Sequence, residues 1–110
     1  MRLSDCPVRA AIDVIEGKWK PIIINALKSR PLRFGQLRRE TPEATKKVLT
    51  AQLRELENDE VICRQHFGMS EGHPRYALTA YGRTLVPLLM HMAKWGAIHK
   101  ERLAENEVRS

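Results

Sequence analysis

The sequence has little cysteine, few aromatic residues and no long apolar run. Its 110 residues include two cysteines and six aromatic side chains. The longest apolar candidate, Leu85–Met90, spans six residues and contains Pro87, whereas a membrane-spanning helix needs about 20 apolar residues. Two cysteines, with no apolar signal in Met1–Pro7, indicate a reducing compartment and free thiols. We therefore expect one soluble, cytoplasmic domain over residues 1–110, with no membrane partner.

The chain also lacks the sequence patterns of common catalytic sites. It has no phosphate-binding glycine loop, no Walker lysine and no nucleophile elbow, and its four histidines and two cysteines are scattered. Cys63 and His66 have the spacing of half a zinc site, but no second pair follows at a ligand spacing. We predict no catalytic residues, no metal site and no cofactor, and hence no enzyme.

Negative charge is missing from one part of the chain. Residues 28–54 hold eight basic and two acidic residues, so their net charge of +6 equals that of the whole protein. No acid occurs between residues 44 and 54. A clustered basic patch favours a polyanionic partner. The alternative is a solvated surface that only keeps the protein soluble.

Apolar spacing and turn residues predict a mainly helical α+β fold with a small β-hairpin. Apolar side chains recur at helical spacing, and proline and glycine mark helix starts and stops. The predicted helices are 7–16, a second ending at Arg30-Pro31, 34–40, 45–58 with Thr45 as N-cap, and one from Thr79 to about Arg102. Pro87 should kink or split the last helix. We expect residues 32–34 to be extended, and strands at 61–67 and 75–79 to form the hairpin.

This order of elements is typical of a winged helix-turn-helix. Two short helices, the second of them basic, precede a hairpin, which predicts a DNA-binding core over residues of about 6–79. Residues 80–103 would form a terminal dimerisation helix. In the basic helix we expect the apolar stripe to be buried and the acid-free face to enter the DNA major groove. The stripe comprises Val48, Leu49, Leu53 and Leu56.

Six short motifs occur in a fixed order between residue 6 and about residue 100. They are Cys6-Pro7-Val8, Gly17-Lys18-Trp19, LRFGQLR at 32–38, KVLT at 47–50, LREL at 53–56, and Tyr76-x-Leu78-Thr79-x-x-Gly82-Arg83. In this order and spacing, the chain resembles the HxlR-type winged helix-turn-helix regulators of bacteria and some archaea. The resemblance implies a dimeric DNA-binding transcription factor whose terminal helices form the dimer.

The chain departs from that family's pattern at both ends of the basic helix. Thr45-Lys46 stands where the family usually has Ser-Pro, and Glu60 stands where it usually has glycine. Glycine at that place usually provides a left-handed helix cap. We therefore expect the cap to fall to Asn58 or Asp59, or to be absent.

The residues that we expect to contact DNA lie on three elements. Those of the basic helix are Thr45, Lys46, Lys47, Thr50 and Arg54. Thr45 and the helix N-terminus would hold a phosphate, Lys47 and Arg54 can donate to guanine, and Gln52 can pair with adenine if it faces the bases. Those of the preceding helix and its lead-in are Arg33, Gln36, Arg38 and Arg39, although Arg38 and Arg39 would alternatively pair with Glu40 or Glu43. Those of the hairpin are Arg64, His66, His73 and Arg75, whose alternative role is to solvate an edge strand.

Two further groups complete the predicted sites. Cys6 precedes the first helix, where helix-terminal amides and Arg9 favour a thiolate and Asp5 opposes it. It is a candidate redox sensor, as in some members of the resembling family, or else only a helix-cap residue. The last helix carries more apolar surface than one monomer can bury. The expected dimer interface comprises Val8, Ile12, Leu89, Met92, Trp95 and Ile98, the alternative being a wholly intramolecular core.

These features predict a homodimeric, sequence-specific transcriptional regulator. A two-fold dimer would place its recognition helices about 34 Å apart and bind a palindromic operator in double-stranded DNA, as a repressor. The sequence is compatible with a redox or small-molecule effector and does not identify one. The alternative is a winged-helix module for protein–protein or RNA contact. The basic helix argues against pure protein contact, and its lack of aromatic residues argues against RNA.

Overall fold

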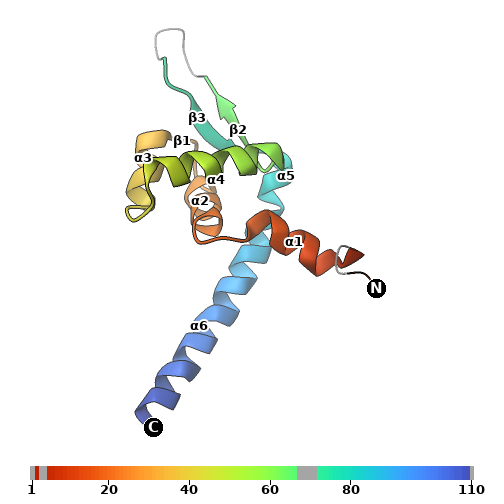
Figure 1. Cartoon of the computed structure of the whole chain (residues 1–110), viewed down its shortest axis with the longest axis vertical. Helices are drawn as coiled ribbons and strands as arrows, with labels where there is room; N and C mark the ends of the chain where they lie inside the picture. The colour runs from red at the N-terminus through yellow and green to blue at the C-terminus, as the bar shows by residue number, and fades with distance from the viewer. Residues whose placement is uncertain (1, 3–4, 67–71, 110) are drawn as a thin grey trace.

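The computed structural model describes residues 2, 5–66 and 72–109. The elements follow in the order α1 (Pro7–Ile15), α2 (Lys20–Leu27), β1 (Leu32–Arg33), α3 (Phe34–Glu40), α4 (Lys46–Asn58), β2 (Ile62–Gln65), β3 (Arg75–Leu78), α5 (Ala80–Arg83) and α6 (Leu85–Arg109). This mainly helical chain with a small antiparallel sheet confirms the predicted winged helix-turn-helix. In Figure 1, α2, α3, α4 and the sheet form one body, from which α6 projects as a long rod.

The sheet has three strands rather than the two of the predicted hairpin. β3 lies between β1 and β2 and is antiparallel to both. The extended piece predicted at residues 32–34 supplies β1, in which Leu32 pairs with Tyr76 and Arg33 with Arg75. β2 is shorter than the predicted strand 61–67, and residue 67 lies outside the described residues. The β1 pairing brings the start of α3 beside the base of the wing.

Side chains from all sides of the body form one apolar core. α4 contributes Leu49, Leu53 and Leu56, which are buried against α2, α3 and the sheet. Val48 was expected to share this stripe, but 39% of it is exposed. Adjacent helical residues are roughly 100° apart, so Val48 cannot face the core together with Leu49. α4 therefore keeps more than half of its circumference outside the core.

Both ends of α4 have defined caps. The Thr45 hydroxyl accepts the backbone N–H of Val48 at 3.1 Å, which confirms the predicted N-cap. At the other end Glu60 has a φ of +61°. The N–H of Val61 donates to Leu56 O at 3.0 Å and that of Glu60 donates to Glu57 O at 2.9 Å, which is a Schellman motif. The expectation of a left-handed cap at Asn58 or Asp59 was wrong, because Val61 must reach the core directly after this turn.

A close approach of two backbones fixes the passage from the sheet to α5. The hydroxyl of Thr79 accepts the N–H of Gly82 at 2.8 Å and donates to Glu60 O at 2.6 Å. The backbone N–H of Thr79 donates to Val61 O at 3.0 Å. A Cβ atom on Gly82 would lie 2.0 Å from Val61 O. Only glycine fits at residue 82 without a backbone shift.

The predicted terminal helix is split, and its second part is longer than expected. α5 ends at Arg83, and α6 begins at Leu85, so that Pro87 lies in the first turn of α6, where its missing N–H breaks no helical hydrogen bond. α6 continues to Arg109 rather than ending near Arg102, because no glycine or proline follows Gly96. No helix in the described part of the chain has the length and apolar character needed to cross a membrane.

Candidate nucleic-acid interface

α4 presents an exposed ridge on the side opposite its buried stripe. Lys47, Ala51, Arg54 and Asn58 recur at intervals of four, three and four residues, and all four are exposed. At roughly 100° per residue they lie opposite Leu49, Leu53 and Leu56. We call these four residues the outer ridge. In the described part of the chain, neither Lys47 nor Arg54 forms an ion pair or a side-chain hydrogen bond.

One flank of α4 faces away from this ridge, toward the connection between α1 and α2. Gln52 donates to Glu55 Oε2 at 3.1 Å, and the ammonium of Lys20 lies 3.1 Å from the same oxygen. The carbonyl oxygen of Gln52 would lie 3.3 Å from a Cβ on Gly17. Gln52 therefore lies in a polar contact within the protein and is not part of the outer ridge.

The other flank borders a basic cleft at the base of the wing. The cleft has a volume of about 840 Å³. It is bounded by α3, the first turns of α4 and the facing ends of β1 and β3. Its basic lining residues are Arg30, Arg33, Arg39, Lys46, His73 and Arg75, and the others are Pro31, Phe34, Gly35, Gln36, Thr50, Pro74 and Tyr76. Among the described residues, no acid lines it, so its described lining carries a net positive charge.

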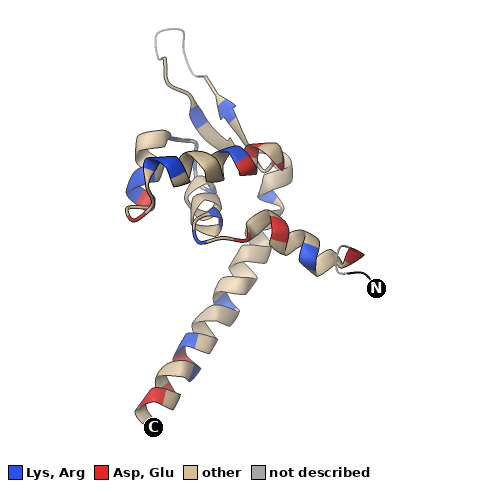
Figure 2. Ribbon diagram, viewed as in Figure 1, with Lys and Arg blue, Asp and Glu red and all other residues tan. Residues whose placement is uncertain are grey.

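The cleft brings together five of the ten basic residues predicted on the three elements, namely Arg33, Arg39, Lys46, His73 and Arg75. Arg30 was missed by sequence reasoning, although it belongs to the basic segment 28–54 and precedes Pro31. Arg38 is exposed on α3 outside the cleft. Figure 2 shows basic residues on α3 and the first half of α4, and acidic residues near the end of α4.

Several predicted residues have internal partners. The carbonyl oxygen of the Gln36 side chain accepts the backbone N–H of Arg33 at 2.9 Å, which leaves the amide nitrogen as a donor. The Thr50 hydroxyl donates to Lys46 O at 2.7 Å. Arg64 on β2 lies 3.0 Å from the Glu57 carboxylate. Arg64 is thus held against α4.

The alternative role of Arg38 and Arg39, an ion pair with Glu40 or Glu43, is absent from the described residues. Glu43 lies 3.9 Å from Lys18 instead. Neither arginine has a carboxylate within ion-pair distance in the described part of the chain. Both side chains are exposed.

The hydroxyl of Tyr76 adds a neutral donor to the cleft. Burial raises the pKa of Tyr76 above its ordinary value of 10.0, the Glu57 carboxylate raises it further, and Arg64 opposes both. The hydroxyl therefore stays protonated at neutral pH. The cleft combines cations and O–H and N–H donors, the groups that bind phosphate oxygens.

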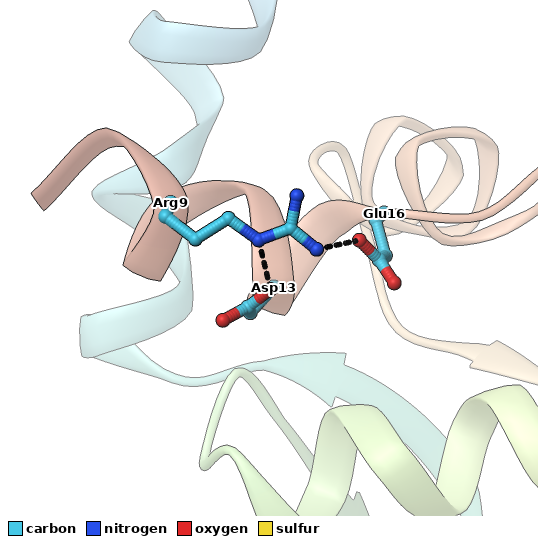
Figure 3. Close-up of polar contacts among 3 residues, drawn as sticks. All are labelled: Arg9, Asp13 and Glu16. Atoms are coloured by element: carbon cyan, nitrogen blue, oxygen red, sulfur yellow. Dashed lines mark hydrogen bonds and ion pairs between the residues drawn. The ribbon is translucent and has the colours of Figure 1, made fainter. Parts of the chain in front are cut away.

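Cys6 lies at the N-cap of α1 and is partly exposed. The guanidinium of Arg9 does not pair with it. Figure 3 shows Arg9 directed along α1, with its Nε 3.0 Å from Asp13 Oδ1 and its Nη2 3.3 Å from Glu16 Oε2. The expected assistance from Arg9 is therefore wrong, because two carboxylates further along the helix neutralise it. Among the described residues, no three His, Cys, Asp or Glu side chains are grouped to hold a metal ion.

The predicted dimer residues lie on two exposed apolar surfaces, with one exception. None of the residues of α6 is buried within the protomer, and Trp95 and Ile98 are 68% and 65% exposed. Val8, Ile12 and Met92 are also exposed. Leu89 instead packs against the core of its own protomer, because it lies on the face of α6 that contacts α2. Leu88, Met92 and Trp95 form a seam at intervals of four and three residues, and the Trp95 ring stacks on His99 with centroids 5.1 Å apart.

Comparison with known proteins gives consistent matches over most of the chain. Residues 14–104 match the family model described as HxlR-like helix-turn-helix. The chain is similar to the HTH-type transcriptional regulator YdeP of Bacillus subtilis, with 42% identity over 102 residues, which cover 93% of this chain and 80% of YdeP.

Two solved structures are similar along nearly their whole length. The redox regulator HypR in its reduced form has a TM-score of 0.84 and 38% identity, covering 91% of this chain and 99% of HypR. The HTH-type transcriptional regulator ytcD has a TM-score of 0.80 and 41% identity, covering 87% of this chain and 98% of ytcD. The family model includes α2–α4, the sheet and most of α6.

Proposed function

The chain belongs to the HxlR-like helix-turn-helix family, and from this premise we propose that it is a homodimeric repressor that binds a palindromic operator. Its fold is that of a DNA-binding transcriptional regulator. The observation that carries the proposal is the pairing of an exposed ridge on α4 with a basic cleft beside it, whose described lining contains no acid. A regulator of this kind acts on the chromosome, so we expect it in the cytoplasm.

The two surfaces suit different parts of a DNA duplex. The outer ridge is narrow and projects from the body, as a helix in the major groove must. Arg54 and Lys47 supply donors for guanine, and Ala51 between them is small enough for contact with a thymine methyl. The cleft lies to one side of the ridge, where the sugar–phosphate backbone would run. We assign base reading to the ridge and phosphate binding to the cleft.

This division predicts a salt dependence. Arg30, Arg39 and Lys46 are the cleft cations without an internal ion pair among the described residues. Two copies of each give six neutralised phosphates per dimer. The slope of log K against log salt concentration would then be about −5 from the cleft alone.

The test is fluorescence anisotropy with a labelled duplex from upstream of the protein's own gene and a scrambled duplex of equal length. Arg54→Ala should weaken binding to the native duplex by about tenfold to a hundredfold and leave the scrambled duplex nearly unaffected. Lys46→Ala should weaken both duplexes similarly and reduce the salt slope by about 2, since each dimer loses two cations. Lys100→Ala, an exposed lysine on α6, is the matched control.

Two results would contradict this function. One is equal affinity of the wild-type protein for both duplexes at every salt concentration, which would favour a protein or RNA partner. The other is a loss in Lys100→Ala as large as that in Arg54→Ala, which would reduce the effect to net charge.

We further propose that Cys6 senses thiol-reactive electrophiles. Cys6 is partly exposed at the start of α1, and the similar protein HypR is a redox regulator. α1 also carries Val8 and Ile12, so a group added to the sulfur would lie beside the proposed dimer surface. Cys6→Ser should bind DNA normally and lose any response to a quinone. An unchanged response in that variant would remove Cys6 from the mechanism.

A further inference from the structure

An apolar groove lies between α2 and the first half of α6. Its volume is about 600 Å³, within the range of small-molecule sites. Ile24, Val86 and Leu89 are its inner side chains, and the partly exposed Ile22 and Met90 form its walls. The remaining lining residues are Pro21, Asn25, Lys28, Met92, Ala93 and Lys94. None of them belongs to the outer ridge or the basic cleft.

The groove is also separate from the apolar seam of α6. At roughly 100° per residue, Val86, Leu89, Met90 and Ala93 lie roughly 140° around the helix from Leu88, Met92 and Trp95. Met92 alone borders both surfaces. A partner helix along the seam would therefore leave most of the groove open.

The charges at the groove select the chemistry of its occupant. Lys28, the C-cap residue of α2, and Lys94 of α6 line it, and among the described residues no acid does. In the described part of the chain, neither lysine has a carboxylate within ion-pair distance. An apolar floor with two unneutralised cations on opposite walls complements a molecule that is apolar at one end and anionic at the other.

We propose that this groove binds one amphipathic organic anion per protomer. The apolar body of the ligand packs against Ile22, Leu89 and Met90, and its acidic group pairs with Lys28 or Lys94. Pairing with either ammonium adds a charge-assisted bond that a neutral molecule of the same shape lacks.

The position of the groove makes its occupant a regulator of DNA binding, an inference that rests on the proposed function. α2 packs against α3 and α4, and α6 carries the apolar seam. A molecule held between α2 and α6 contacts both the DNA-reading body and the helix that sets its place in a dimer. Any change in the angle between them changes the spacing of the two copies of α4, which an operator of fixed length does not tolerate.

The binding test uses two fluorescent probes of nearly equal shape and no DNA. Anilinonaphthalene sulfonate carries one negative charge, and N-phenylnaphthylamine has the same ring system without it. We expect one sulfonate probe per protomer, bound at least tenfold more tightly than the neutral probe, because only the sulfonate can pair with a lysine ammonium. Lys28→Met and Lys94→Met should reduce this preference, and both together should abolish it. Lys100→Met, on α6 outside the groove, should leave it unchanged.

A second pair of variants tests the location. Ala93→Phe would place a ring in the groove and should weaken both probes, whereas Ala97→Phe, one turn further along α6, should not. Equal binding of the two probes, or equal effects of the two phenylalanine variants, would overturn the site. Probe binding that disappears as protein concentration rises would show that a second protomer fills the groove, and would also overturn it.

The regulatory step is tested separately, with DNA present. Saturating sulfonate probe should change the affinity of the wild-type protein for its operator by at least fivefold, and should not do so in Ala93→Phe. If the probe binds and the operator affinity stays constant, the groove is not regulatory. If no operator binding occurs at all, the proposed DNA function fails while the probe measurements still decide the site.

Discussion

Replacing Glu60 by glycine should stabilise the protein. Glu60 is the C′ residue of the Schellman motif that ends α4, and its φ is +61°. A side chain with a Cβ atom is unfavourable in this left-handed region, whereas glycine adopts it freely. The side chain of Glu60 is exposed and forms no hydrogen bond or ion pair in the described part of the chain, so its removal costs little packing.

The magnitude follows from three opposing contributions. Relief of the left-handed conformation contributes about 1–2 kcal/mol. The greater freedom of glycine in the unfolded chain offsets about 0.5–1 kcal/mol of this. Removal of an anion from the C-terminal end of a helix adds a few tenths of a kcal/mol. We expect the free energy of unfolding to rise by about 1 kcal/mol, which raises Tm by about 2–6 °C for a domain of this size.

Two variants separate these contributions in urea or thermal unfolding at fixed protein concentration. Glu60→Gln removes the charge and keeps the Cβ, so it should gain only a few tenths of a kcal/mol. Asp59→Gly places glycine where φ is −84°, so it should lose about 0.5–1 kcal/mol. Glu60→Gly that is no more stable than Glu60→Gln would refute the left-handed strain at this position.

Three other substitutions test the packing, the polar contact and the dimer surface. Gly82→Ala should destabilise the fold by about 3 kcal/mol or more in urea unfolding, because its Cβ would lie 2.0 Å from Val61 O. Its control is Gly35→Ala, which should not destabilise the fold because its Cβ meets open space. Glu55→Gln should cost about 1–2 kcal/mol, because it leaves the Lys20 ammonium, whose side chain is 7% exposed, without its carboxylate partner. The value is set below that of a fully buried pair because Glu55 is 54% exposed, and Glu43→Gln, which disrupts an exposed pair, should cost almost nothing. Trp95→Ala should raise the dimer dissociation constant, measured by sedimentation equilibrium, by about thirtyfold or more. Lys100→Ala should leave this constant unchanged. Equal dissociation constants for the two variants would show that Trp95 is not in the interface.

Sequence reasoning located features that depend on neighbouring residues. The bounds of α3, the Thr45 N-cap and the stop at Gly17, whose φ is +114°, follow from local signals such as proline, glycine and hydroxyl side chains. The split of the last helix was also foreseen from Pro87. Each of these features is determined within a few residues of the signal.

Features that depend on distant contacts were missed or misplaced. The extended segment at residues 32–34 was predicted, but its pairing with β3 as a third strand was not, because a two-residue strand is too short for a periodic pattern. The cap at Glu60 is set by burial of Val61 next to Gly82, which is distant in sequence. Arg9 was assigned to Cys6 because helical spacing allows a contact in either direction along α1, but the two carboxylates lie only on one side.

The acids near the end of α4 illustrate the same distinction. The sequence alone shows that these acids occur only after residue 54, which assigns them no structural role. In the structure, Glu55 holds Lys20 of α2 at 3.1 Å, and Glu57 holds Arg64 of β2 at 3.0 Å. These two contacts lie on opposite flanks of α4. The first joins α4 to α2 in the body, and the second joins it to β2 in the wing.

Such a pair of contacts restrains the rotation of α4 about its own axis. A rotation by one residue, roughly 100°, would replace the outer ridge by a different set of side chains. Burial of the apolar stripe opposes this rotation. The two ion pairs, one on each flank of α4, oppose rotation in either sense. The segregation of charge along α4 therefore serves two purposes. Under the proposed function, the unpaired cations of the first half remain available to DNA, while the paired anions of the second half help to fix which face those cations present.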